Sequence, residues 1–152
     1  MKRLYLAYGS NLNLDQMKFR CPDAKIIGTG KISDYELLFK GSLTGSYLTI
    51  EKKPGAYVPV AIWETSEADE RTLDVYEGCP RFYYKKLLTI PCRDKSGKVH
   101  NRTAYVYIMH EDRKIGVPRN EYVEACMEGY KAFGFDEELL WTAYTNALKL
   151  AK

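Results

Sequence analysis

The sequence predicts one α+β domain over residues 1–152, with a small mixed, strongly curved sheet or barrel of about six or seven strands and surrounding helices, two of them at the C-terminus. Three observations lead to this prediction. Short segments of strand character fill the first two thirds of the chain, and helical spacing dominates the last third. The 152 residues, 45% of them hydrophobic, suffice for one core and leave little room for a second. No internal repeat or linker divides the chain.

The N-terminal segment predicts a buried strand followed by a tight turn. Residues 2–8 are rich in Leu and Tyr, which suits a strand covered on both faces. The run ends at Gly9-Ser10-Asn11, three small residues typical of turns. Asn13 or Asp15 can then cap a short helix, which has to end by Pro22 because the residue before a proline avoids helical angles.

The central part of the chain predicts four strands and one helix. The strands are expected at residues 24–28, 35–39, 47–53 and 58–64. The last two are separated by the turn dipeptide Pro54-Gly55. A helix follows over 66–77, because Ser66 can cap its first turn with Asp69 three residues later. Gly78 is a suitable residue for ending that helix.

The last part of the chain predicts a hairpin and two helices. Strands at 83–91 and 99–109 flank the polar loop Asp94-Lys95-Ser96-Gly97, which is typical of an antiparallel hairpin. A helical period follows, carried by Tyr122, Cys126, Tyr130 and Phe133. Gly134 interrupts this period, and Asp136 can cap a second helix that continues to the C-terminus.

Charge and cysteine usage argue against several classes of partner. The 23 basic and 20 acidic residues leave a formal charge of +3, and Lys and Arg are scattered, so no nucleic-acid partner is expected. No run approaches the length of a membrane span and the N-terminus lacks the apolar core of a secretory signal, so we expect no membrane partner and a cytoplasmic location. The four cysteines and two histidines show no ligand spacing, so no metal site is predicted. The oligomeric state stays open.

The turn at Gly9-Ser10-Asn11 is a candidate anion-binding site. It places successive backbone amides at the end of a rigid strand, and a glycine allows them to point at one spot. A simple polar turn is the alternative, because Gly-Ser-Asn is common turn chemistry. The phosphate-binding and dinucleotide-binding glycine patterns are absent, so nucleotide binding has no support.

The segment Leu73-Asp74-Val75-Tyr76-Glu77-Gly78 holds a candidate acid/base residue. Glu77 stands at the last helical position, facing the negative end of the helix dipole, and Asp74 lies one turn back on the same side. Both features should raise the pKa of the Glu77 carboxyl group. The alternative is a solvated acidic helix face formed by Glu70, Asp74 and Glu77. Lysine or arginine would interact more favourably with the negative end of the helix dipole in the last turn, so an acidic residue at this position needs an explanation.

Taken together, the stretches at residues 5–12 and 73–78 resemble the gamma-glutamylcyclotransferase family, including its AIG2-like relatives. The order and separation of Tyr-Gly-Ser-Asn and Asp-x-x-Glu-Gly agree with that family, and the likeness covers nearly the whole chain. Further points of likeness are residues 34–39, the Pro54-Gly55 turn, residues 60–63, Tyr84 and the paired C-terminal helices. The resemblance implies the same small α+β fold.

The resemblance also implies a set of site residues. Its strand-end loop binds the substrate through backbone groups, which here are those of Tyr5, Leu6, Ala7, Tyr8, Gly9 and Ser10, with Asn11 shaping the turn. Glu77 is implied as the catalytic acid/base residue. Tyr122 matches a substrate-contacting tyrosine of relatives, and Tyr84 is expected to line the same cavity.

The implied reaction closes a gamma-glutamyl amide into 5-oxoproline and releases the attached amine or amino acid, with no cofactor. A non-catalytic binding module for a glutamyl-like metabolite is the alternative, and a nucleic-acid adaptor is a third hypothesis. Cys79-Pro80 after Gly78, and Lys86 in place of an arginine or apolar residue, depart from the family pattern. These departures leave the choice of small-molecule substrate open.

Overall fold

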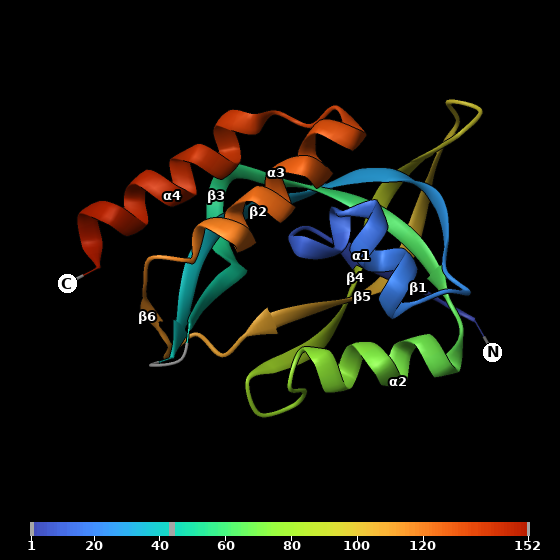
Figure 1. The fold of residues 1–152 in the computed structure, drawn as a ribbon. Coiled ribbons are helices and arrows are strands. Elements are labelled where there is room, and N and C mark those ends of the chain that lie inside the picture. Colours follow the sequence, from blue (N-terminus) through green and yellow to red (C-terminus); the bar gives the residue numbers. More distant parts are fainter. Residues whose placement is uncertain (1, 43–44, 152) are drawn as a thin grey trace.

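The computed structural model describes residues 2–42 and 45–151, so residues 1, 43, 44 and 152 of the predicted domain lie outside the described part. Within the described residues the chain forms six strands, four α-helices and one short 3-10 helix, η1 (Figure 1). In chain order they are β1 (Arg3–Ala7), η1 (Ser10–Leu12), α1 (Leu14–Arg20), β2 (Lys25–Ser42), β3 (Gly45–Thr65), α2 (Glu67–Tyr76), β4 (Tyr83–Asp94), β5 (Val99–Met109), β6 (Lys114–Ile115), α3 (Asn120–Phe133) and α4 (Glu137–Leu150).

The sheet is a closed barrel. Five strands follow the order β3-β1-β5-β4-β2, and pairing between β2 and β3 closes the ring, with β6 added beside β2. The sheet is mixed, because β1 runs parallel to β5 and antiparallel to β3. Glycine makes the seam between β2 and β4 possible, since a Cβ on Gly30 would lie 2.6 Å from the Pro91 carbonyl oxygen. The predicted curved, mixed sheet with surrounding helices is therefore confirmed.

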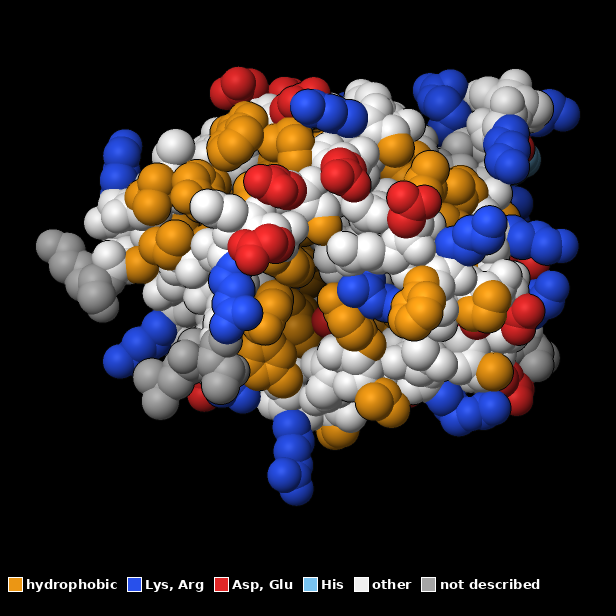
Figure 2. All heavy atoms as spheres, viewed as in Figure 1, with side chains coloured by type: hydrophobic (Ala, Val, Ile, Leu, Met, Phe, Trp, Pro, Cys, Tyr) orange, Lys and Arg blue, Asp and Glu red, His pale blue; other side chains and the backbone are white. Residues whose placement is uncertain are grey.

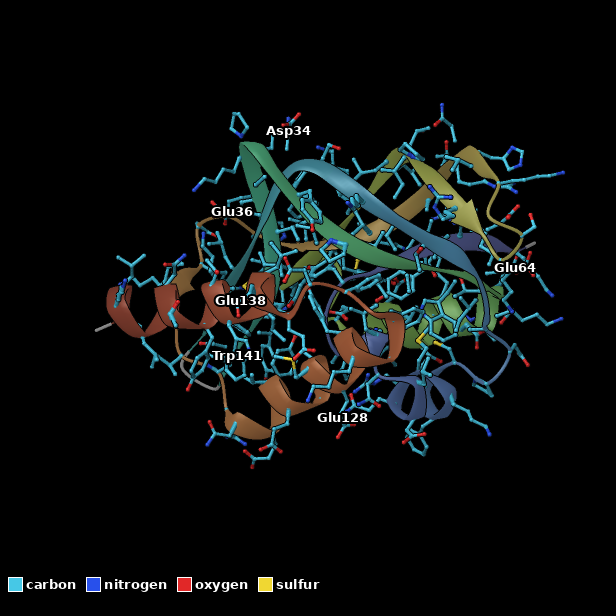
Figure 3. The ribbon with its side chains drawn as sticks, turned by 90° about the horizontal axis from the view of Figure 1, so that it is seen from above. Asp34, Glu36, Glu64, Glu128, Glu138 and Trp141 are labelled. Atoms are coloured by element: carbon cyan, nitrogen blue, oxygen red, sulfur yellow. The ribbon has the colours of Figure 1, made fainter. Side chains whose placement is uncertain are left out.

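The prediction of four short central strands is wrong in one respect, because two long bent strands take their place. β2 and β3 pair along their length, and the register shifts between Ser33 and Tyr35. Asp34 has a φ of 62° there, and its Oδ1 accepts a hydrogen bond from the Gly55 amide at 2.9 Å. Pro54-Gly55 is thus part of a bulge in a continuous strand instead of a turn between two. Figure 3 shows Asp34 of β2 at this corner and Glu64 near the C-terminal end of β3.

The helices begin and end as the sequence predicts. Asn13 caps α1 by accepting a hydrogen bond from a first-turn amide, which selects it over Asp15. Ser66 and Asp69 form a capping box at α2. Gly134 ends α3 in the left-handed conformation, with a φ of 69°, and the Asp136 side chain caps α4. None of these helices is long and apolar enough to cross a membrane, within the residues described.

Two contacts fix the positions of α3 and α2, the helices that border the candidate site. In the view of Figure 1, α3 and α4 lie above the barrel and α2 lies below it. α3 approaches η1 at Gly129, where a Cβ would lie 2.6 Å from the Leu12 carbonyl carbon. α2 is tied to β4 by the Lys85 ammonium, which pairs with Glu70 at 2.6 Å and Asp74 at 3.0 Å. The end of β1 is therefore enclosed between α3 and the C-terminal end of α2.

Candidate active site

A cavity of about 220 Å³ lies where β1 ends, between η1, α3 and the C-terminal end of α2. Figure 2 shows this face hollowed at its centre, with hydrophobic and aromatic side chains around the hollow. Among the described residues, seven tyrosines line the cavity: Tyr5, Tyr8, Tyr47, Tyr76, Tyr83, Tyr107 and Tyr122. The remaining lining residues are Gly9, Ser10, Asn11, Leu48, Glu77 and Phe82. A single carboxylate therefore faces an aromatic, hydroxyl-rich hollow.

The strand-end loop, residues 8–11, forms one wall of the cavity. β1 stops pairing with its neighbours after Ala7. The chain then turns tightly, with the Leu12 amide donating to the Gly9 carbonyl at 3.0 Å. Within the described residues, the amides of Gly9 and Ser10 donate to no protein acceptor. These two donors are available to a ligand in the cavity.

Glu77 provides the carboxyl group of the cavity. It follows the last residue of α2, and its amide donates to the Leu73 carbonyl at 2.8 Å. Burial raises the pKa of Glu77 to about 7, against the opposing effect of the Arg20 guanidinium. No protein group in the described residues donates a hydrogen bond to this carboxylate, so no hydrogen bond compensates for its loss of water.

Glu70, Asp74 and Glu77, which the sequence offers as one acidic face, have different surroundings in the structure. Glu70 binds Arg3 and Lys85, and Asp74 binds Lys85 and accepts a hydrogen bond from the Tyr107 hydroxyl at 2.7 Å. Glu77 alone lines the cavity. The predicted rise in the pKa of Glu77 is confirmed, but its cause is corrected, because burial and not the Asp74 charge produces it.

Buried tyrosines fix the opposite wall. The Tyr83 hydroxyl donates to the Leu48 carbonyl at 2.7 Å, and the Tyr122 hydroxyl accepts from the Leu48 amide at 3.1 Å. Burial raises the pKa of both phenols well above the ordinary value, so they stay neutral. Gly9 faces this wall, and a Cβ on it would lie 3.3 Å from the Tyr122 hydroxyl oxygen. An alanine at Gly9 would therefore require the Tyr122 hydroxyl to move by a few tenths of an ångström.

Arg20, at the end of α1, binds two of the residues that line the cavity. Its guanidinium donates to Asn11 Oδ1 at 2.6 Å, to Gln16 Oε1 at 2.9 Å and to the Tyr76 hydroxyl at 2.8 Å. It also lies 3.8 Å from the centroid of the Tyr76 ring. Asn11 in turn donates to the Tyr5 hydroxyl at 2.9 Å. This network joins β1, the strand-end loop, α1 and α2.

Most of the residues expected at the site lie together. The ones that line the cavity are Tyr5, Tyr8, Gly9, Ser10, Asn11, Glu77 and Tyr122. Leu6 and Ala7 lie outside its lining, because they pair with Ile62 and Ala61 of β3 inside the sheet.

The expected position of Tyr84 is corrected. Successive side chains of a strand point to opposite faces, and Tyr83, one residue earlier, occupies the cavity wall. Tyr84 lies in a separate hollow, where its hydroxyl donates to Glu111 Oε2 at 2.5 Å. A two-residue period around the Tyr-Tyr pair leaves either tyrosine as a candidate, so the sequence pattern alone could not choose between them.

Sequence reasoning missed six lining residues: Tyr47, Leu48, Tyr76, Phe82, Tyr83 and Tyr107. The sequence does offer a reason to expect Tyr76 at the site, because it directly precedes Glu77. Tyr47 and Tyr107 come from β3 and β5, and only the closing of the barrel brings those strands to the end of β1. Arg20 was missed for a related reason, because its distance from Glu77 in sequence hides their proximity.

No metal-binding cluster of three or more His, Cys, Asp or Glu side chains is present in the part of the chain that the structure describes. All four cysteines are free thiols, and Cys79 is the one that is only half-buried. The groups of the cavity lining that can exchange protons or form hydrogen bonds include the Glu77 carboxyl group, the amides of Gly9 and Ser10, and the tyrosine hydroxyls.

Comparison with known proteins gives the family. Residues 5–128 match the family described as gamma-glutamyl cyclotransferase, AIG2-like. The gamma-glutamylcyclotransferases of Mus musculus and Homo sapiens are 27% and 28% identical over 142 residues, each match covering 89% of this chain and 73% of the relative. A solved structure of a gamma-glutamyl cyclotransferase is 25% identical, with a TM-score of 0.79 over 94% of this chain and 86% of that one. The chain belongs to the gamma-glutamyl cyclotransferase, AIG2-like family and is an enzyme of that family.

Proposed function

We propose that the protein closes the gamma-glutamyl group of a gamma-glutamyl amide into 5-oxoproline and releases the attached amine or amino acid, with Glu77 as general base and acid. The observation that carries this proposal is the place of the Glu77 carboxyl group, which shares a small cavity with the amides of Gly9 and Ser10. The pKa of Glu77, about 7, supports it further. A carboxyl group with that pKa accepts and returns protons near neutral pH.

The proton transfers can be written so that they balance. The substrate enters with its α-amine as an ammonium, which cannot attack, so Glu77 as carboxylate accepts one of its protons. The amine attacks the γ-carbonyl carbon of the same molecule, and the bond from that carbon to the leaving nitrogen breaks as Glu77 returns the proton there. Glu77 then carries the second proton from the ring nitrogen to the released amine, so over the whole turnover the ring nitrogen loses two protons and the leaving nitrogen gains two. Glu77 ends as it began.

Orientation supplies much of the expected rate gain. Nucleophile and electrophile belong to one molecule, so the enzyme mainly has to hold the glutamyl chain curled. The cavity of about 220 Å³ equals roughly seven liquid-water volumes, and covalently bonded atoms lie closer together than separate waters, so it holds the about nine heavy atoms of a glutamyl group. The free amides of Gly9 and Ser10 can hold either the substrate carboxylate or the oxyanion that develops on the γ-carbonyl. Tyr5, Tyr8 and Tyr122 complete the proposed binding surface, with Asn11 holding the loop.

The test is a panel of gamma-glutamyl amino acids and gamma-glutamyl amines, with 5-oxoproline measured by chromatography. We expect 5-oxoproline from at least one class and a fall of about 10²- to 10⁴-fold in kcat/KM for Glu77→Gln, because the variant lacks the acid/base group. Glu124→Gln, an exposed change on α3, is the matched control and should retain the parent activity.

Two outcomes would contradict the proposal. If folded Glu77→Gln forms 5-oxoproline at the parent rate, Glu77 is not the acid/base residue. If the parent binds the panel compounds in calorimetry and forms no product over long incubation, the protein is a binding module for a glutamyl-like metabolite.

A further inference from the structure

Arg20 carries a positive charge that no acidic side chain in the described residues neutralises. Its three hydrogen-bond acceptors, Asn11 Oδ1, Gln16 Oε1 and the Tyr76 hydroxyl, are all neutral. The guanidinium is nevertheless half-buried and well fixed, because it also stacks on the Tyr76 ring at 3.8 Å. A fixed charge without an acidic partner keeps its effect on groups nearby, more strongly in a partly dry site than in water.

The partners of Arg20 belong to the two halves of the cavity. Asn11 is part of the strand-end loop, and Tyr76 is the residue directly before Glu77. Figure 2 shows positively charged side chains beside the opening of the hollow. The guanidinium therefore connects the loop that offers free amides with the helix end that carries the carboxyl group.

The other titratable groups around Glu77 are neutral or already paired. Phenols face it from β1, β4, β5 and α3, and burial raises the pKa of each above the ordinary value: Tyr5, Tyr8, Tyr83, Tyr107 and Tyr122. Tyr47 of β3 and Tyr76 line the same cavity. Burial raises the pKa of the Cys79 thiol, and Asp74 is bound by Lys85 and Tyr107. Arg20 is the opposing charge that acts on Glu77.

We propose that Arg20 is a positioning residue for the acid/base step: its guanidinium holds the strand-end loop against the end of α2 and supplies the positive charge that favours the carboxylate form of Glu77. This inference rests on the proposed function, because it concerns the protonation of the proposed base. Burial acts in favour of the neutral carboxyl group, and Arg20 acts in favour of the carboxylate. The balance between these two effects places the proton exchange of Glu77 near neutral pH.

The experiment compares kcat/KM from pH 5 to 9 in the parent and in Arg20→Met, Arg20→Lys and Arg113→Met. Removing the charge in Arg20→Met should raise the pKa of Glu77. The acid limb, which is the low-pH side of the plot of kcat/KM against pH, should then move up by about 1 pH unit. As a result, kcat/KM should fall about tenfold further at pH 6 than at pH 9. Arg20→Lys keeps the charge but not the planar fork, so it should lower kcat/KM at every pH and leave the limb in place.

Arg113→Met is the matched control for loss of a cation near the opening. Arg113 stacks on Phe82, a lining residue, with its guanidinium carbon 4.8 Å from the ring centroid, whereas the charge that lowers the pKa of Glu77 is that of Arg20. The acid limb of the Arg113→Met profile should therefore lie at the same pH as that of the parent. If Arg20→Met lowers kcat/KM equally at all pH values, Arg20 serves the structure alone and the inference is wrong.

A direct titration separates this inference from the proposed function. The Glu77 carboxyl carbon is labelled with ¹³C and its chemical shift is followed against pH, with Glu77→Gln identifying the signal. A higher pKa in Arg20→Met supports the inference whatever the turnover. An unchanged pKa in that variant overturns the inference alone, whereas an active Glu77→Gln overturns the proposed function.

Discussion

A carboxyl group that loses water without gaining a hydrogen bond binds its proton more tightly, and Glu77 is in that situation. The carboxylates of Glu70 and Asp74 on α2 are not in this situation, because they form ion pairs with lysine and arginine side chains of the barrel. Glu77 stands one turn further on, where the helix ends above the cavity. Acidic residues three or four apart along the chain therefore have different surroundings: two bind basic side chains, and the third has the carboxyl group that we propose for proton exchange.

The raised pKa of Glu77 predicts a stability effect with a definite sign. The native state binds the proton more tightly than the unfolded state between pH 4.5 and about 7, so the free energy of unfolding falls as pH rises through that window. Glu77→Gln removes this effect. We expect parent and variant to be nearly equally stable at pH 4.5, and the variant to be more stable by about 1–3 kcal/mol at pH 8.

Urea unfolding of both proteins at the two pH values measures this difference. Other titrating groups contribute equally to parent and variant and cancel. A difference between the two proteins that does not change with pH would show that Glu77 ionises in the native state as easily as in the unfolded chain.

At the scale of elements, the strand-end loop depends on the helix that covers it. Asn13 lies between them, with its Nδ2 donating to the Ala125 carbonyl at 3.2 Å and to Glu128 Oε2 at 2.8 Å. Figure 3 shows Glu128 on α3. Gly129, one residue later, lets the backbone of α3 approach Leu12. The loop is therefore held from outside the cavity as well as from within it.

Gly129→Ala should disturb this contact. Alanine gains about 1 kcal/mol in helix propensity over glycine, but the new Cβ would lie 2.6 Å from the Leu12 carbonyl carbon, and backbone cannot rotate away as a side chain can. We expect a net loss of about 1–3 kcal/mol in the free energy of unfolding and a higher KM, because the loop has to shift.

Urea unfolding and steady-state kinetics measure the two effects. Glu124→Ala introduces the same residue at an exposed position of α3 and should leave both values close to those of the parent. A Gly129→Ala variant with unchanged KM would mean that the loop keeps its shape without this contact.

At the scale of the whole molecule, the closed barrel brings distant segments to one cavity. β1 lies between β3 and β5, and both neighbours contribute tyrosines to the wall. The seam between β2 and β4 is short, extending from Gly28 opposite Asp94 to Gly30 opposite Cys92. The barrel therefore closes through few backbone pairs on that side.

Gly30→Ala tests how much the seam contributes. Its Cβ would meet the Pro91 carbonyl oxygen at 2.6 Å, so we expect a loss of about 1–3 kcal/mol in the free energy of unfolding. Neither residue lines the cavity, so the folded variant should keep the parent kcat. Lys25→Ala, an exposed change on β2, is the control for denaturant unfolding. Equal stability of Gly30→Ala and the parent would show that the strands can separate locally at no cost.

Local sequence was enough to predict the elements whose signals are local. The Gly-Ser-Asn turn, the Ser66 and Asp136 caps and the Gly134 stop each depend on residues within one turn of chain, and all four lie where expected. The family motifs likewise placed the loop and Glu77 at one site, because each motif is contiguous.

Tertiary structure decided what depends on contacts between distant segments. Whether Pro54-Gly55 ends a strand or bends it depends on the pairing of Asp34 with Gly55, and which of Tyr83 and Tyr84 faces the cavity depends on the register of β4, where one residue changes the face. The cause of the raised pKa of Glu77 was decided in the same way. Burial and the Arg20 guanidinium of α1 both act on Glu77 through space, and the order of residues along the chain shows neither of them.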